Sequence, residues 1–156
     1  MADSDANWVY VTVASDDPNS IYAALPTQLP YSFRNNLAQP VRFPPEARVQ
    51  VALFSLSFTY TLGAANETTF DVDSNVVSQG IAGSQLVNTL RRFTVDDPWA
   101  TLPQTWTPNM LQWMPAVAND ITDIELVISR ITALTTDATE FTTPTHATLV
   151  FRAVYD

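Results

Sequence analysis

The sequence has no cysteine and no lysine, and it contains one histidine and three glycines. Without cysteine the chain has no disulfide, no thiolate metal site and no cysteine nucleophile. The single histidine, His146, has no second histidine to share a metal ion, which excludes a histidine-based zinc or iron site. No apolar run approaches about 18 residues, so we expect no membrane span. We therefore expect no metal, no cofactor and no catalytic residue.

The charge balance is strongly acidic. All seven cations are arginines, and against sixteen acidic residues they leave a net charge of −9. Because no basic cluster exists beyond Arg91-Arg92, we expect no direct binding to nucleic acid. The N-terminus, MADSDAN, lacks the basic and apolar segments of a signal peptide. Residues 1–6 are expected to form a flexible acidic arm before a single domain at residues 7–156.

The longest strand-like segment is Ala47–Tyr60, reading ARVQVALFSLSFTY. Polar and apolar residues alternate along it, as they do in a half-buried strand. The alternation changes phase where Leu53 and Phe54 are adjacent. One face stays apolar only if the chain bulges or bends there, so the sequence predicts a long, bent strand around which the rest of the domain folds.

Further strands are predicted on both sides of this segment. Asn7–Ala14 has two faces suited to burial, so we expect an inner strand or one covered by a neighbouring subunit. Pro40 within Leu37–Phe43 indicates an edge or bulged strand. The remaining candidates are Tyr31–Phe33, Thr68–Val72, Ile121–Ile131 and Ala147–Tyr155.

One segment has a helical pattern. Within Ser84–Phe93, the residues Leu86, Leu90 and Phe93 recur at helical spacing, and Ser84 can cap the N-terminus. Arg91-Arg92 would then lie where the helix dipole favours cations. One short helix among seven or eight strands predicts an all-β fold: a single jelly-roll β-sandwich of eight strands in Greek-key order, with one short inserted helix.

The segment Asp96–Pro115 combines four prolines with three tryptophans and has no clear period. It is expected to be either a long ordered loop or an irregular strand pair. Three interpretations of Trp99, Trp106 and Trp113 stay open: they fill the ends of the core, anchor a protein interface or stack on sugars.

Other polar features have a simpler interpretation. His146 could act as a base only if a carboxylate oriented it, and a surface or interface position at a strand end is favoured. The acidic pairs Asp16-Asp17, Asp71-x-Asp73 and Asp96-Asp97 do not match the calcium-loop pattern and fit solvated turns better. Asn66-Glu67-Thr68 matches the glycosylation sequon, which we interpret as chance.

Four features follow one another in the first part of the chain. They are an initial strand at Val9–Val13, a loop with proline and tyrosine at Ile21–Tyr31, an apolar-proline step at Val41–Pro45 and the strand RVQVALFSLSF. This order resembles single jelly-roll minor capsid proteins, of the penton type, of eukaryotic double-stranded DNA viruses (the polinton, virophage and adintovirus-like group and their larger relatives). SQLVNTLRRF resembles their short helix, and ITDIELVIS with HATLVFRAVY resembles their closing strand pair. The segments Asp96–Pro115 and Thr132–Thr145 depart from the family pattern.

The resemblance implies a virion structural protein that forms a homopentamer at an icosahedral vertex of the capsid and docks against major capsid proteins and other minor capsid proteins. In that role, three arginines within strands are candidate partners for carboxylates of a neighbouring subunit. These arginines are Arg42, Arg48 and Arg152. The candidate aromatic anchors are Trp99, Trp106 and Trp113. The alternative is a carbohydrate-binding or receptor-binding β-sandwich module that uses the tryptophan-rich segment. A cupin-like enzyme is disfavoured, because one histidine cannot build its metal site.

Overall fold

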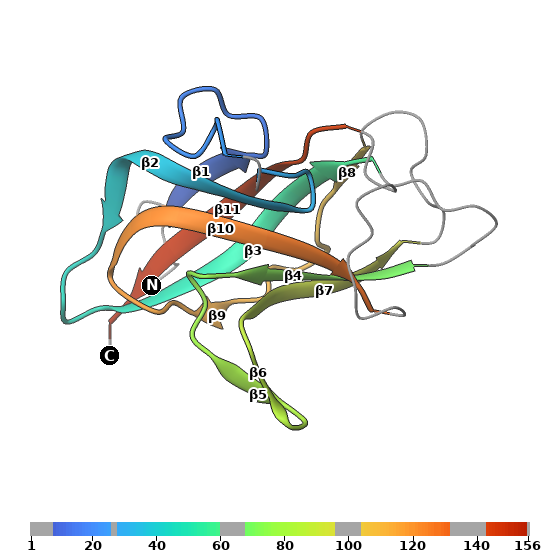
Figure 1. Cartoon of the computed structure of the whole chain (residues 1–156). Coiled ribbons are helices and arrows are strands. Elements are labelled where there is room, and N and C mark those ends of the chain that lie inside the picture. Colours follow the sequence, from blue (N-terminus) through green and yellow to red (C-terminus); the bar gives the residue numbers. More distant parts are fainter. Residues whose placement is uncertain (1–7, 26–27, 60–67, 96–103, 132–142, 156) are drawn as a thin grey trace.

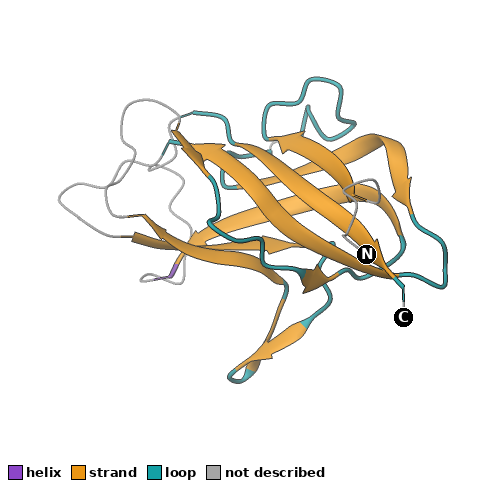
Figure 2. Cartoon of the chain, turned by 180° about the vertical axis from the view of Figure 1, so that it is seen from behind, coloured by secondary structure: helices purple, strands orange, loops and turns teal. Residues whose placement is uncertain are grey.

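The structure is a computed structural model that describes residues 8–25, 28–59, 68–95, 104–131 and 143–155. Two antiparallel sheets face each other, and a hairpin projects from the lower side of the sandwich in these views (Figures 1 and 2). The strands are β1 (Trp8–Ala14), β2 (Ser32–Arg42), β3 (Arg48–Phe58), β4 (Thr68–Ser74), β5 (Gly80–Ala82), β6 (Gln85–Val87), β7 (Thr89–Val95), β8 (Gln104–Trp106), β9 (Met114–Pro115), β10 (Asp120–Arg130) and β11 (His146–Val154).

The strand pairing is nested. One sheet, here called the β3 sheet, has the order β1-β11-β3-β8, and β9 also pairs with β3; the other, the β10 sheet, has the order β2-β10-β4-β7. Thus β1 pairs with β11, β2 with β10, β3 with β8 and β9, and β4 with β7. A long hairpin ribbon folded into two sheets gives this pattern, which is that of a jelly roll. With β8 and β9 taken as two halves of one strand, the expected all-β sandwich is confirmed.

The core lies between the two sheets. Phe58 of the β3 sheet meets Phe70 and Phe93 of the β10 sheet, with ring centroids 5.3 Å and 6.2 Å away. Aliphatic side chains fill the remaining space, including Leu126 and Leu149, neither of which is exposed. Burial of these side chains, at about 25 cal/mol per Å² of apolar area, stabilises the sandwich.

The predicted bulge in the long strand is confirmed. Thr148 of β11 faces Ser55 and the next residue, Leu149, faces Leu53, so Phe54 is the extra residue on β3. Leu53 and Leu56 are both buried, while Phe54 points out of the sandwich with 40% of its surface exposed. The bulge therefore keeps the apolar residues on both sides of it in the core.

Both N-terminal strands lie at sheet edges. The segments Tyr31–Phe33 and Leu37–Phe43 join into the single strand β2, which contains Pro40 and has an irregular register opposite β10, as that proline indicates. β1 is the end strand of the β3 sheet, so the inner-strand alternative is wrong, and cover by a neighbouring subunit stays a prediction. The closing strands β10 and β11 lie in different sheets and do not pair with each other.

The predicted helix at Ser84–Phe93 is wrong, because this segment forms β6 and most of β7. Gly83, at φ 61°, takes the left-handed conformation that a two-residue hairpin turn requires between β5 and β6. In β7 the register shifts, with Arg91 facing Val72 and Thr89 facing Asp73. This irregularity brings Leu90 and Phe93, three residues apart, into the same core, which imitates helical spacing. The structure thus has an inserted hairpin, β5–β6, where a helix was expected.

Candidate interaction surface

The outer face of the β3 sheet carries rows of side chains that cross the strands. One row consists of Trp8, Arg152, Gln50 and Pro115, which face one another across β1, β11, β3 and β9. Because Val13 and Leu149, one residue out of phase, point into the core, this row lies on the outer side.

Trp113 lies against this row. The Arg152 guanidinium is 4.0 Å from the centroid of the Trp113 ring, and its Nε donates a 2.8 Å hydrogen bond to Gln50 Oε1. Trp113 also meets Trp8 edge to face, with ring centroids 5.3 Å apart. The structure therefore brings together two of the candidate residues, Trp113 and Arg152, and adds Trp8, which is not among the residues predicted from the sequence.

The next row is apolar. Tyr10 faces Val150, and Val150 faces Ala52. Val150 and Ala52 are completely buried although they lie on the outer face. Tyr10 and Phe54 contact each other edge to face at 5.2 Å, and they remain 49% and 40% exposed. We call Trp8, Tyr10, Phe54, Trp113 and Arg152 the aromatic face.

Beyond the aromatic face the sheet becomes polar. Thr12 and Thr148 share a hydrogen bond of 3.1 Å between their hydroxyl groups. Exposed His146 lies at the start of β11, and its Nε2 is 3.1 Å from Asp16 Oδ1. Ser57 faces His146 across the ladder. A carboxylate partner for His146 is therefore present, in an open position at the strand end.

The other sequence candidates lie elsewhere. Trp106 of β8 stacks on core residue Phe93 at 4.3 Å, with the Arg91 guanidinium 5.5 Å from its ring, so it extends the core toward the end of the sandwich. Arg42 is on β2 and pairs with Asp120 at 3.1 Å within the chain. Arg48 is exposed at the start of β3. Trp99 lies outside the described residues, as do arm residues 1–6 and the pair Asp96-Asp97.

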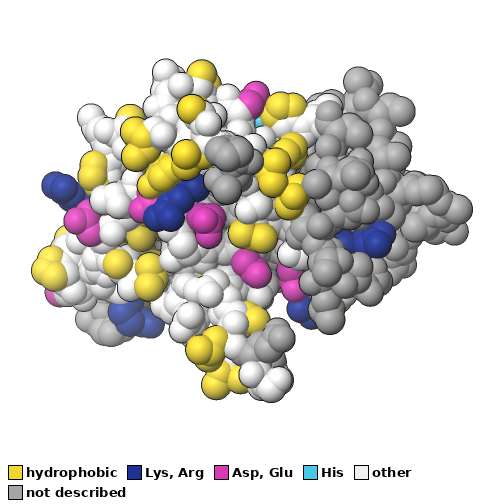
Figure 3. Space-filling model, in the orientation of Figure 1, with side chains coloured by type: hydrophobic (Ala, Val, Ile, Leu, Met, Phe, Trp, Pro, Cys, Tyr) yellow, Lys and Arg dark blue, Asp and Glu magenta, His cyan; other side chains and the backbone are white. Residues whose placement is uncertain are grey.

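The outer face of the β10 sheet is charged. Figure 3 shows acidic and basic side chains side by side on it. Arg34 pairs with Asp123, and Arg92 makes two hydrogen bonds of 2.7 Å and 3.0 Å to Asp71. The carboxylate of Asp71 raises the pKa of Arg92 by accepting these bonds. This face is thus largely neutralised within the chain, and its character differs from that of the aromatic face.

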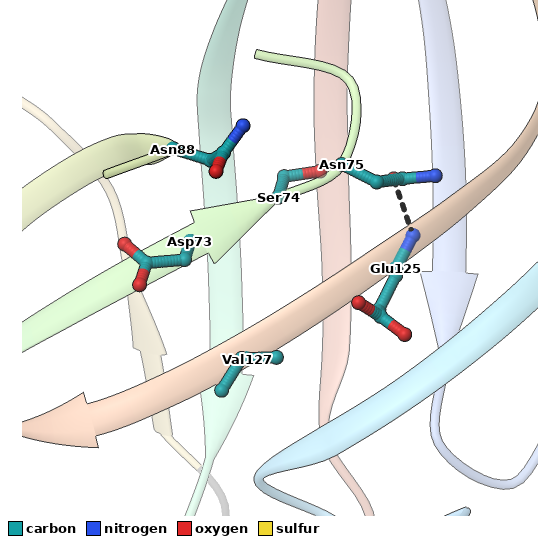
Figure 4. A pocket seen from close by; sticks show the side chains of 6 residues that line it. All are labelled: Asp73, Ser74, Asn75, Asn88, Glu125 and Val127. Carbon is teal, nitrogen blue, oxygen red and sulfur yellow. Dashed lines mark hydrogen bonds between the residues drawn. The ribbon is translucent and has the colours of Figure 1, made fainter. Parts of the chain in front are cut away.

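A hollow of about 330 Å³ lies on the same side of the molecule, and Figure 4 shows its lining. The carboxylates of Asp73 and Glu125 line it together with Asn75 and Asn88. Asn75 Oδ1 accepts a 2.8 Å hydrogen bond from the Glu125 backbone. Burial raises the pKa of Asp73, whose Oδ1 has no hydrogen-bond partner. Among the described residues, no group of three or more histidine, aspartate or glutamate side chains could hold a metal ion.

The projecting hairpin carries apolar side chains. Ile81 of β5 and Leu86 of β6 face each other, and they are 80% and 67% exposed. The hairpin extends away from the sandwich, with hydrophobic atoms on its surface (Figures 1 and 3). Contiguous exposed apolar surface often marks a contact site, and these two side chains add such surface to the hairpin. In the described segments, no helix combines the length and the apolar character needed to cross a bilayer.

Comparisons with known proteins give a likeness to solved structures and no family. No protein-family model matches the chain, and no curated protein matches it. Over 96% of its length the chain is similar to a chain in the crystal structure of the infectious bursal disease virus VP2 subviral particle, at 12% sequence identity and a TM-score of 0.31. The match covers 33% of that chain. Similarity at this level supports no conclusion about function.

Proposed function

We propose that this chain is a structural protein of a virus particle, a single jelly-roll subunit that works through contacts with copies of itself and with neighbouring shell proteins. The aromatic face is the observation that carries the proposal. Tyr10 and Phe54 expose large aromatic surface on an open sheet, and aromatic side chains are the commonest anchors of protein interfaces. The exposed pair Ile81 and Leu86 offers a second contact site on the hairpin.

The finer form of the proposal is a minor capsid protein of the penton type. In this form five copies associate at an icosahedral vertex and dock against major capsid proteins, and the protein is located in the capsid. It acts by binding and not by catalysis, and it needs no cofactor. The stiff sandwich, with its apolar core and eleven prolines in the chain, suits a subunit that must keep its shape.

A carbohydrate-binding role has less support from the two described tryptophans of the segment. The Arg152 guanidinium lies over the Trp113 ring, and Trp106 stacks on Phe93. A sugar would have to displace Arg152 before it could stack on that face of Trp113. For this reason the protein-interface interpretation of Trp113 is preferred.

Light scattering after size exclusion tests the proposal. A particle near five times the 17.3 kDa chain is expected for the full-length protein. Phe54→Ser removes an exposed ring from the aromatic face and should reduce association about tenfold. Val127→Ser removes an apolar side chain from the outer side of the β10 sheet. It serves as the matched control and should leave association unchanged. A strict monomer at every concentration, with no binding to capsid proteins, would contradict the proposal.

A further inference from the structure

Among the described residues, no strand pairs with the outer edge of β1. β1 pairs with β11 on one side only, since it is the end strand of the β3 sheet. Within the described residues, no backbone hydrogen bond joins the opposite edge of Trp8, Tyr10 or Thr12 to another strand. An edge strand with free N–H and C=O groups is a template for a further strand.

Backbone hydrogen bonds at Ser15 and Ala14 show which residues direct their N–H and C=O groups toward this edge. The Ser15 backbone N–H donates to the Thr145 carbonyl at 2.9 Å, so Ser15 faces β11. Ala14 points the other way: its N–H donates to Asn35 Oδ1 at 2.8 Å, and its carbonyl accepts from Asn35 Nδ2 at 2.9 Å. The direction of the backbone N–H and C=O groups alternates along a strand. Those of Thr12, Tyr10 and Trp8 therefore point to the open edge, as those of Ala14 do.

Asn35 already behaves like one residue of a neighbouring strand. Its side-chain amide supplies one donor and one acceptor to Ala14, which is the pairing that a backbone peptide would make. Asn35 is itself buried on β2, so this contact is part of the fold. It closes the edge at Ala14 and leaves the edge open from Thr12 back to Trp8.

A groove runs beside the open part of the edge. It has a volume of about 340 Å³ and lies between Tyr10, Val11 and Thr12 of β1 and residues 35–39 of β2. Asp17 is the charged residue among those that line it, and its Oδ1 accepts a 2.9 Å hydrogen bond from the Asn19 backbone. The space next to the unpaired backbone groups is therefore hollow, as an added strand requires.

The sequence of β1 lacks the features that normally protect an edge. Trp8–Ala14, reading WVYVTVA, contains no charge, no proline and no glycine. Natural edge strands are usually guarded by lysine, proline or a bulge, and β1 pairs with β11 in an unbroken register. In a chain of net charge −9, an uncharged strand is a place where two copies can meet without facing like charges.

We propose that β1 pairs with β1 of a second copy, antiparallel and about a two-fold axis at Tyr10. In this register Tyr10 faces Tyr10, Trp8 faces Thr12 and Val9 faces Val11 of the other copy. The residues that point outward then exchange about six backbone hydrogen bonds. The pairing is symmetric about Tyr10, and it ends before Ala14, whose N–H and C=O groups are already bonded to the Asn35 side chain. The fold therefore favours this register. The two β3 sheets become one continuous sheet.

This contact goes beyond the proposed capsid role and stands independently of it. A ring of five copies has only head-to-tail contacts, whereas a β1–β1 contact is isologous. It would therefore join two rings into a particle of about twice the mass of one ring, or form a simple dimer where no ring is present. Loss of the five-copy ring and loss of the β1 contact are consequently separate results.

Cysteine substitution tests the register, because the chain has no cysteine of its own. Facing residues of a hydrogen-bonded pair have Cα atoms about 5.5 Å apart, within the reach of a disulfide. Thr12 and its own copy would be roughly 13 Å apart along the strands, which is out of reach. We expect Tyr10→Cys to form a covalent dimer at least about tenfold faster than Thr12→Cys, as measured by non-reducing electrophoresis under mild oxidation.

A second set of variants tests the backbone edge. Tyr10→Pro removes an N–H that points outward, a position where edge strands tolerate proline, and should leave a folded protein that does not pair. Thr12→Val keeps the outward N–H and adds no charge, so it should pair like the parent and serves as the matched control for a lysine at this position. Thr12→Lys places a guarding lysine on the strand and should also prevent pairing. Equal cross-linking of the two cysteine variants, or unchanged association of Tyr10→Pro and Thr12→Lys, would overturn the proposal.

Discussion

Two carboxylates on β4 differ in their surroundings although they are two residues apart. Asp71 accepts two hydrogen bonds from Arg92, at 2.7 Å and 3.0 Å. Asp73 lies in the hollow of the β10 sheet with Oδ1 unpartnered, and burial raises its pKa. A carboxylate whose pKa is raised in the folded state takes up a proton more readily there than in the unfolded chain. Asp73 therefore destabilises the fold when it is ionised, whereas Asp71 stabilises it.

Asp73→Asn should increase the stability of the protein at neutral pH. As pH rises above the ordinary value of 3.8, the unfolded chain loses this proton before the folded chain does. Stability then falls with rising pH until Asp73 is ionised in both states. Asparagine removes this cost, so we expect the melting temperature to rise by about 2 °C at pH 7 and the gain to vanish below the ordinary pKa. Thermal unfolding by circular dichroism across pH measures both.

Asp71→Asn is the matched control for this change. It removes the same charge from the same strand but leaves Arg92 without its paired carboxylate, so the melting temperature should fall by about 2 °C. If both variants lowered the melting temperature equally, the assignment of Asp73 as a destabilising group would be wrong.

At the scale of elements, the bulge in β3 is a single extra residue. Deleting Phe54 would leave Leu53 pointing inward, Ser55 outward and Leu56 inward, which restores regular alternation opposite β11. We therefore expect the deletion variant to fold with the same strand content and to lose about 1 kcal/mol, chiefly the Tyr10–Phe54 contact. Far-ultraviolet circular dichroism and chemical denaturation would measure this.

Deletion of Val127 provides the contrast. Val127 lies in a regular part of β10, where Leu126 and Ile128 both point into the core. Its loss would turn Ile128 and the residues after it to the opposite face, and we expect the protein not to fold. A Phe54 deletion variant as unstable as the Val127 deletion variant would show that the bulge is required by the fold.

The same kind of bulge explains both a success and a failure of sequence reasoning. In β3 the adjacent residues Leu53 and Phe54 break a long alternation, so the irregularity was visible in the sequence. In β7 the irregularity brings Leu90 and Phe93 into the core at a spacing of three, which sequence reasoning interpreted as a helix. Only the pairing with β4, a contact distant in sequence, separates these possibilities.

The aromatic face could be predicted only in part. Trp113 and Arg152 were candidates from the sequence, but their contact depends on how Gln50, Arg152 and Trp8 align across three strands. Trp8 and Tyr10 could have been recognised from the two-faced pattern of their strand, and Phe54 from its place at the bulge. What joins them is strand register, which a single sequence does not determine.

At the scale of the whole molecule, two kinds of contact between copies make opposite predictions about salt. The chain carries a net charge of −9, so copies repel one another, and salt screens this repulsion. The ion pairs described on the β10 sheet are satisfied within the chain, by Arg34 with Asp123 and by Arg92 with Asp71. The surfaces proposed for contact, β1 and most of the aromatic face, are uncharged.

Association should therefore strengthen with salt. Between about 0.1 M and 1 M the screening length falls from about 10 Å to about 3 Å, and we expect the association constant to rise about tenfold. Sedimentation of the parent protein across this range measures it, with Phe54→Ser as a variant whose weaker association should keep the same salt dependence. Weaker association at high salt would instead indicate ion pairs between subunits. The arginines predicted for that role, Arg42, Arg48 and Arg152, would then carry the interface in place of the exposed rings of Tyr10 and Phe54.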